Sequence, residues 1–143
     1  MSISKRRALR AAIVFSAVVA LADVCAEDAG SAAKAPEAKR TILDRHDQAG
    51  VADKEIILGT AEFPKGAVIG WHTHSGDEAG YVLRGNLVLK TRGQPDKALK
   101  AGDYFFNARG AVHSLEAAPE GEGGAVVSTW IVDKGKPLAD PVH

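Results

Sequence analysis

Apolar residues beyond residue 40 come in short runs, rich in β-branched and aromatic side chains, that alternate with polar positions. This pattern is typical of half-buried β-strands, and no stretch there keeps the 3.6-residue repeat of an amphipathic helix. The expected strands are Thr41–Leu43, Glu55–Phe63, Val68–His74, Ala79–Leu83, Leu87–Thr91, Ala98–Leu99, Tyr104–Phe106, Val112–Glu116 and Ala125–Val132. Short strands at this spacing predict an all-β domain over residues 41–143, built as an antiparallel sandwich or barrel.

Turn-forming residues separate these expected strands. The predicted turns are Pro64–Gly66, Ser75–Asp77, Arg84–Asn86, Gly93–Asp96, Ala101–Asp103, Arg109–Gly110 and Pro119–Gly124. Glycine supplies backbone angles that other residues avoid, so the 15 glycines of the chain fit a polypeptide that reverses direction often.

The N-terminus has a different pattern, which predicts a cleavable signal peptide over residues 1–26. A basic segment, Lys5–Arg10, precedes an unbroken apolar run over residues 11–22, and small residues follow at Val24 and Ala26. This order is the three-part plan of a secretory signal. Twelve apolar or small residues are too few for a transmembrane helix, which needs about 20. We therefore expect a periplasmic or secreted protein with no permanent membrane span.

Two further features of this terminus refine the expectation. Arg6 and Arg7 resemble the pair of a twin-arginine export signal, although Lys5 precedes them and the usual Phe is missing. Cys25 raises the alternative of a lipoprotein anchor, which the residues before it fit poorly. Residues 27–40 are rich in Ala, Lys, Glu and Pro without periodicity, and we interpret them as a flexible leader.

Charge and cysteine content exclude several classes of function. The 18 basic and 18 acidic residues give no net charge, so nothing in the bulk composition favours a nucleic-acid partner. Cleavage after Ala26 removes four basic residues and one acidic residue, which leaves 14 basic and 17 acidic residues. It also removes Cys25, the only cysteine, so the mature chain has no disulfide, thiol nucleophile or thiolate ligand.

The candidate chemistry lies in three histidines and a glutamate. His72 and His74 are separated by one residue in an expected strand, so both side chains point to the same face. Glu78 opens the next strand after a turn, and His113 lies on a later strand. Three imidazole nitrogens and one carboxylate oxygen suit a divalent transition-metal ion better than calcium, magnesium or copper(I). Six-coordination would leave two positions open for water, dioxygen or substrate.

Simpler interpretations compete with the metal site. A single histidine on a strand is more often structural than a ligand, and Glu78 could be a solvated turn residue. Asp77 is a rival for the role of Glu78. Arg84 could neutralise an anionic substrate, but its place before Gly85 in an expected turn favours an exposed side chain. Beyond the four candidates, the sequence identifies few inward polar groups with certainty, which favours a binding module.

The same residues resemble the two motifs of the cupin superfamily. The first motif corresponds to Gly66, His72, His74, Glu78 and Gly85, and the second to Gly102, Gly110 and His113. All spacings of the first motif are kept, and sixteen residues separate the motifs. The family usually has Pro where Ala108 stands and Asn where Ala117 stands, which puts local rigidity in doubt rather than metal binding.

This resemblance, closest to small single-domain cupins of the quercetin dioxygenase-like kind, implies a double-stranded β-helix or jelly-roll barrel. It implies that His72, His74, Glu78 and His113 bind one divalent ion, which in this family is Mn, Fe, Ni, Co, Cu or Zn. By analogy, Glu78 is also the candidate catalytic base.

Three functions follow from the sequence. The leading one is an exported dioxygenase-like enzyme acting on a small organic molecule. A non-catalytic module that binds or senses a small ligand and a metal-dependent isomerase or decarboxylase are the alternatives. Because cupins often pair, we expect a homodimer.

Overall fold

The computed structural model describes residues 36–143, which form β-strands and connecting turns. The strands are β1 (Lys39–Asp47), β2 (Lys54–Pro64), β3 (Val68–Thr73), β4 (Gly76–Thr91), β5 (Lys97–Lys100), β6 (Tyr104–Asn107), β7 (His113–Ala117), β8 (Gly123–Asp133) and β9 (Asp140–Pro141). These residues contain no helix, and thus no helix that could cross a membrane. The predicted signal peptide over residues 1–26 lies outside the described residues, as does the leader up to residue 35.

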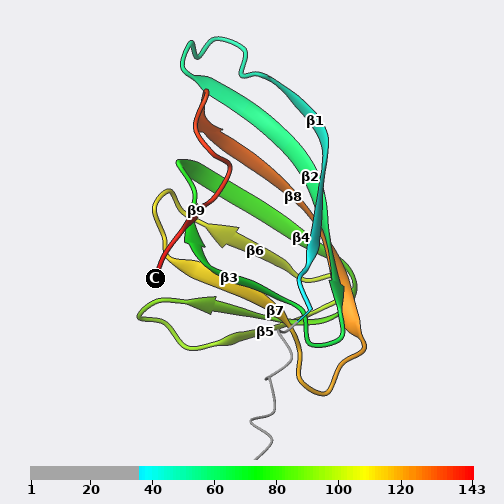
Figure 1. Cartoon of the computed structure of the whole chain (residues 1–143). Helices are drawn as coiled ribbons and strands as arrows, with labels where there is room; N and C mark the ends of the chain where they lie inside the picture. Colours follow the sequence, from blue (N-terminus) through cyan, green and yellow to red (C-terminus); the bar gives the residue numbers. More distant parts are fainter. Residues whose placement is uncertain (1–35) are drawn as a thin grey trace, which may run out of the picture. The chain divides into compact units, whose positions relative to one another are not determined.

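The strands form two sheets that share the long strand β4 (Figure 1). One sheet has the order β1-β2-β8-β4-β6, and the other has the order β5-β4-β7-β3-β9. Every pairing between these strands is antiparallel. The predicted all-β jelly roll, a double-stranded β-helix, is therefore confirmed.

Strand β4 corrects one predicted turn. The sequence suggested a reversal at Arg84–Asn86, but the chain continues and passes from one sheet into the other there. Inward positions are even-numbered up to Val82 and odd-numbered from Leu87, because a bulge adds one residue between them. Gly85 has φ of 77°, and a Cβ on it would lie 2.0 Å from the carbonyl oxygen of Gly123. Only glycine fits this crossing point.

The N-terminal boundary of the fold also differs from the prediction. β1 begins at Lys39, so the last two residues of the predicted leader already belong to the sheet. Arg40 pairs with Ala61 of β2, and Glu37 makes an isolated parallel bridge to Val68. Six other expected strands end within two residues of the observed ones, whereas β9 was not predicted.

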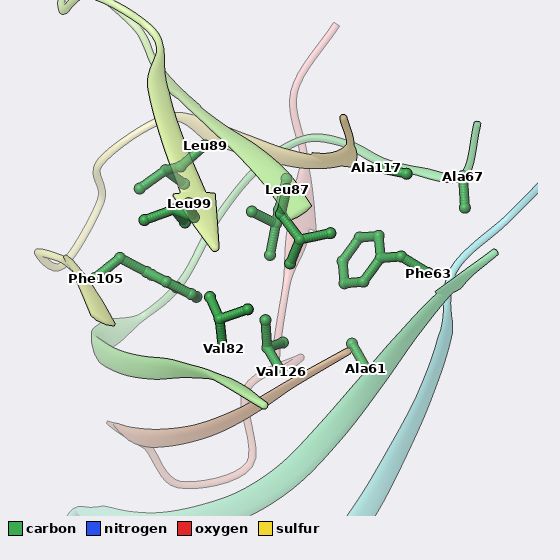
Figure 2. Close-up of a cluster of buried hydrophobic side chains, with 11 residues drawn as sticks. Ala61, Phe63, Ala67, Val82, Leu87, Leu89, Leu99, Phe105, Ala117 and Val126 are labelled. Carbon is green, nitrogen blue, oxygen red and sulfur yellow. The ribbon is translucent and has the colours of Figure 1, made fainter. Parts of the chain in front are cut away.

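An apolar cluster fills much of the interior (Figure 2). Phe63, Leu87, Leu99 and Phe105 come from four different strands and are each at most 2% exposed. Burying one such side chain contributes about 1.5–3 kcal/mol relative to leaving it in water. A second cluster contains Ile57, Trp130 and Val132, with Leu138 packed against it. The aromatic run of β6 divides between the two faces, since Phe105 is buried while Tyr104 and Phe106 are 67% and 72% exposed.

Candidate metal centre

The fold brings all four predicted site residues together inside the barrel. His72 lies on β3 and pairs directly with His113, the first residue of β7. His74 follows the end of β3, and Glu78 lies on β4. The four side chains belong to residues that are between 2% and 6% exposed. The alternation that predicted a shared face for His72 and His74 is confirmed by their burial.

Three hydrogen bonds orient the imidazole rings. The Nδ1 atoms of His72, His74 and His113 lie 2.7, 2.5 and 2.9 Å from the carbonyl oxygens of Gly70, Leu138 and Ala111. A carbonyl oxygen only accepts, so each Nδ1 carries the proton and donates it. Each Nε2 then carries a lone pair, and that of His74 accepts a 3.3 Å hydrogen bond from Nε1–H of Trp130. Metal-binding histidines are held by other groups in this way.

The Nε2 lone pairs converge. One ligand nitrogen from each of His72, His74 and His113 lies within 4.8 Å of the others. The ring centroids are 4.3–5.1 Å apart, and Nε2 of His113 is buried with no hydrogen-bond partner. Nitrogens bound to one ion at about 2.0–2.1 Å must lie within roughly 4.2 Å of each other, so small shifts suffice to close this set around a cation.

Glu78 completes the cluster. Its Oε2 lies 3.4 Å from Nε2 of both His74 and His113, and it accepts a hydrogen bond of 2.8 Å from Nδ2 of Asn107. Because Nδ1 holds the proton of each neutral ring, the contacts between Oε2 and the two Nε2 atoms join acceptors to acceptors. Such contacts repel unless positive charge lies among them. A divalent cation supplies that charge, so the donor set fits a metal ion.

Electrostatics support the same conclusion. Burial raises the pKa of Glu78, but its side-chain contacts with His113, His74 and Asn107 outweigh burial and hold the pKa well below its usual range. Burial lowers the pKa of His72 to about 4, helped by the nearby charges of His113, His74 and Arg40. Glu78 is therefore anionic and His72 neutral near neutral pH, which are the states that bind a metal.

The structure separates Glu78 from its rival. Asp77 is exposed, and its Oδ1 accepts a hydrogen bond of 2.8 Å from the backbone N–H of Arg109. It therefore holds the loop before β7 and faces away from the histidines. Arg84 is also exposed, as expected, and pairs with Glu62.

Four residues of the site were missed in the sequence. Asn107 and Trp130 lie directly opposite Glu78 on the two neighbouring strands, and the Trp130 Nε1–H points to Nε2 of His74 at 3.3 Å. Ser128 and Arg40 also line the interior. In β6 every second side chain faces inward, so the buried Phe105 could have indicated that Asn107 also faces inward. No local sequence pattern indicates that Arg40 does. The sequence offered few certain inward polar groups beyond the four candidates, and the structure adds Asn107, Ser128 and Arg40 to them.

A small cavity adjoins the cluster. Its volume is about 20 Å³, which is room for little more than one water molecule. The lining residues are Arg40, Ala61, Ile69, His72, Glu78, Phe105, Asn107, His113, Leu115, Val126, Ser128 and Trp130. A larger groove of about 210 Å³ lies next to it and shares Arg40, Ile69 and His72 with its wall. Trp71, which alternation with His72 and His74 predicted to pack on the sheet, instead lines this groove and is 39% exposed.

Comparison with known proteins identifies the family. The cupin domain family matches residues 59–132, which include all three histidines and Glu78. The chain belongs to the cupin superfamily. Among solved structures, a cupin-like protein of Thermotoga maritima is similar to this cupin at 28% identity and a TM-score of 0.54, covering 73% of this chain and 75% of the other. The polyketide cyclase RemF of Streptomyces resistomycificus has 23% identity and a TM-score of 0.57, covering 76% and 73%; it shares the fold.

One curated relative matches a shorter part of this cupin. It is the oxalate-binding protein of Thermotoga maritima, 35% identical over 65 residues. The match covers 45% of this chain and 53% of the relative, so it spans about half the length of that protein.

The two departures from the cupin motifs leave the site intact. The turn that contains Ala108 closes through a 2.9 Å hydrogen bond from Ala111 N–H to the Ala108 carbonyl, so it forms without proline. Gly110 N–H donates to the carbonyl of His74 at 3.1 Å, which ties this turn to the histidine cluster. Ala117 is buried and its N–H donates to the carbonyl of Ala67 at 2.9 Å.

Proposed function

We propose that this cupin is a metal-dependent, dioxygenase-like enzyme that acts on a small organic molecule. One observation carries the proposal: Nε2 of His74 and of His113 each lie 3.4 Å from the buried Oε2 of Glu78, while all three histidines turn Nδ1 to a backbone carbonyl. The metal would be held by His72, His74, His113 and Glu78. When bound, such an ion supplies Lewis acidity and, if it is redox-active, electron transfer to dioxygen.

Glu78 is the proton acceptor in this proposal. Its carboxylate is buried, anionic and held by Asn107. Its contacts with His113, His74 and Asn107 keep its pKa low, so it is a weak base that takes a proton only from an acidic donor. Phenols and the enols of diketones, with pKa values of about 10, would become such donors only when a metal ion held in the site binds their oxygen. These compounds are therefore the substrates to test first.

The walls around the cluster keep bulk water out. Phe105, Leu115 and Val126 cover the cavity with apolar surface, and its small volume admits only a few atoms beside the histidines. A larger substrate would extend into the neighbouring groove beside Trp71. Exclusion of water protects reactive intermediates and strengthens electrostatic interactions in the site.

Oxygen consumption tests the proposal. Protein loaded separately with Mn, Fe, Co, Ni or Cu is mixed with a panel of phenols and diketones, and oxygen uptake and products are measured. We expect uptake by wild type and its loss in Glu78→Gln, while His46→Ala retains it because His46 is an exposed residue of β1. A fully loaded wild type that neither takes up oxygen nor alters any compound contradicts enzymatic function.

A second candidate function is a metal-containing module that binds a small ligand without converting it. The small cavity favours it, as does the similarity to a relative whose name describes oxalate binding. The two candidates are distinguished by the fate of the ligand. A binding module returns the compound unchanged after long incubation, whereas an enzyme returns a product.

We also propose export, supported by the basic and apolar pattern of residues 1–26. Fractionation of cells that produce the full chain should place the protein outside the cytoplasm, shortened at its N-terminus. Unchanged export of Arg6→Lys/Arg7→Lys would remove the twin-arginine route. Retention of full-length protein in the cytoplasm would remove export altogether.

The homodimer remains a proposal as well. Tyr81 and Tyr104 pair across β4 and β6 and are 49% and 67% exposed, beside the exposed Phe106. An apolar surface of this kind is typical of a protein interface. Sedimentation should give twice the monomer mass, and Tyr104→Lys should shift it to the monomer. A monomeric wild type contradicts this proposal.

A further inference from the structure

Arg40 occupies an unusual position for an arginine. It lies on β1 and its side chain lines both the small cavity and the groove outside it. It is half-buried, and its Nε is fully buried without a hydrogen-bond partner. An unpaired buried donor of this kind is costly, so a ligand that accepts from it would be bound favourably.

Three of the other four arginines within residues 36–143 have carboxylate partners; the fourth, Arg92, is exposed and lies 5.9 Å from the ring centroid of Trp71. Arg45 pairs with Glu55, Arg84 with Glu62 and Arg109 with Asp133. Within residues 36–143, no carboxylate forms an ion pair with Arg40. Its guanidinium instead lies 5.8 Å from the ring centroid of Trp130. Stacking on an aromatic face holds the guanidinium in one place and leaves its N–H groups available to a ligand.

The charge of the site gives Arg40 a function. Burial lowers the pKa of Arg40, while the negative charge of Glu78 opposes that effect. A divalent ion in the cluster would more than neutralise Glu78, because the ion carries two positive charges and the carboxylate one negative charge. Together with the cationic Arg40, the site would carry a net charge of +2. A positively charged, largely buried cavity selects an anion.

Resting on the proposed function, we infer that Arg40 is the specificity-determining residue of this cupin and that its ligand is a compact organic acid, so that the phenols or enols it prefers carry a carboxylate. The carboxylate of the ligand pairs with the guanidinium of Arg40 at the boundary between the cavity and the groove. The ligand then reaches the cluster through the cavity, while any apolar remainder lies beside Trp71 in the groove. The anion-binding role considered for Arg84 in the sequence belongs to Arg40.

The probes are malonate and its uncharged analogue malonamide. Their binding to zinc-loaded protein is measured by isothermal titration calorimetry for wild type, Arg40→Gln and Arg40→Lys. We expect wild type to prefer malonate, and Arg40→Gln to bind it at least about tenfold more weakly. Arg40→Lys should recover part of the affinity, since lysine keeps the charge but not the planar fork. Malonamide binding should change little in any variant.

The matched control is Arg84→Gln, which removes an exposed arginine outside the cavity and should leave malonate binding unchanged. Zinc content is measured for every protein, because Arg40 is not a ligand and Arg40→Gln should still hold one ion. Circular dichroism establishes that Arg40→Gln is folded; if it is not, Arg40→Lys carries the test.

Three results would overturn the inference. Equal malonate affinity in wild type and Arg40→Gln is one, no malonate binding to the loaded wild type is another, and equal affinity for malonate and malonamide is the third. A different result would contradict the proposed function: wild-type protein that binds no metal. In that case the same malonate comparison on the metal-free chain decides the role of Arg40 alone.

Discussion

The interior of the barrel has two regions with opposite chemistry. In the apolar cluster around Phe63, Leu87 and Leu99, side chains contribute through the volume they fill (Figure 2). In the polar cluster around Glu78 and the histidines, each atom needs a particular partner, because an unpaired buried polar group is costly. The two regions meet at the cavity wall, which Phe105 helps to form. Stability and ligand chemistry are thus assigned to adjoining parts of one interior.

The difference between the regions predicts separable defects. A change in the apolar cluster should lower stability and leave the metal stoichiometry of the folded protein intact. A change in the polar cluster should alter metal binding more than it alters the fold. Both regions are supplied by the same strands, since β4 carries Glu78 near one end and Leu87 near the other.

Phe63→Ala should have the largest effect. Phe63 is 1% exposed, and its removal should lower the free energy of unfolding by about 3–5 kcal/mol through lost burial and the cavity left behind. Urea denaturation measures the change. Phe106→Ala is the matched control, because Phe106 is 72% exposed and should cost no more than about 0.5 kcal/mol. Equal losses in the two variants would contradict the assignment of the core.

His113→Ala should act on the metal instead. Removing one nitrogen should weaken zinc or manganese affinity at least about 100-fold, which corresponds to ~2.7 kcal/mol. Excess metal should raise the melting temperature of wild type, and chelation should lower it, because the ion binds the folded state alone. The variant should lose this response while its metal-free form still unfolds cooperatively. Undiminished affinity in His113→Ala would remove this histidine from the site.

Asn107→Ala should have a smaller effect on metal affinity. Asn107 contacts the cluster only through Glu78, with a 2.8 Å hydrogen bond to Oε2. Loss of an orienting partner typically weakens metal binding by about tenfold, or ~1.4 kcal/mol. Metal titration with a competing chelator measures it, and Asn86→Ala, at an exposed position of β4, is the control. A loss as large as that of His113→Ala would contradict an indirect role.

The smallest expected effect is the pH dependence of the free energy of unfolding. The pKa of His72 is about 4 in the fold, below the ordinary 6.5, so the unfolded chain binds more protons between these values. The contribution of His72 is therefore complete above pH 6.5 and decreases as the pH falls toward 4. For metal-free protein, we expect the free energy of unfolding to rise with pH between about 4 and 6.5, with a contribution from His72 below ~1.4 kcal/mol per pH unit. Urea denaturation across this window measures it. A His72→Gln variant with the same slope as wild type would contradict the assignment.

Several elements were predictable because local spacing sets them. The two-residue repeat of a strand places His72 and His74 on one face whatever the rest of the fold does. Glycines with positive φ, such as Gly102 and Gly110, mark turns where only that backbone conformation closes the chain. Gly85 gave the same signal but marks the passage of β4 between the sheets. A glycine indicates an unusual backbone angle without telling which structure uses it.

The sequence by itself determined the strand pattern, the shared face of His72 and His74, and the set of residues able to bind a metal. Only the tertiary structure decided that Glu78 rather than Asp77 faces the histidines, and that Asn107 and Arg40 join them. The physical reason is distance along the chain. Alternation within one strand follows from local backbone geometry, whereas the register between distant strands is chosen by burial of the whole interior.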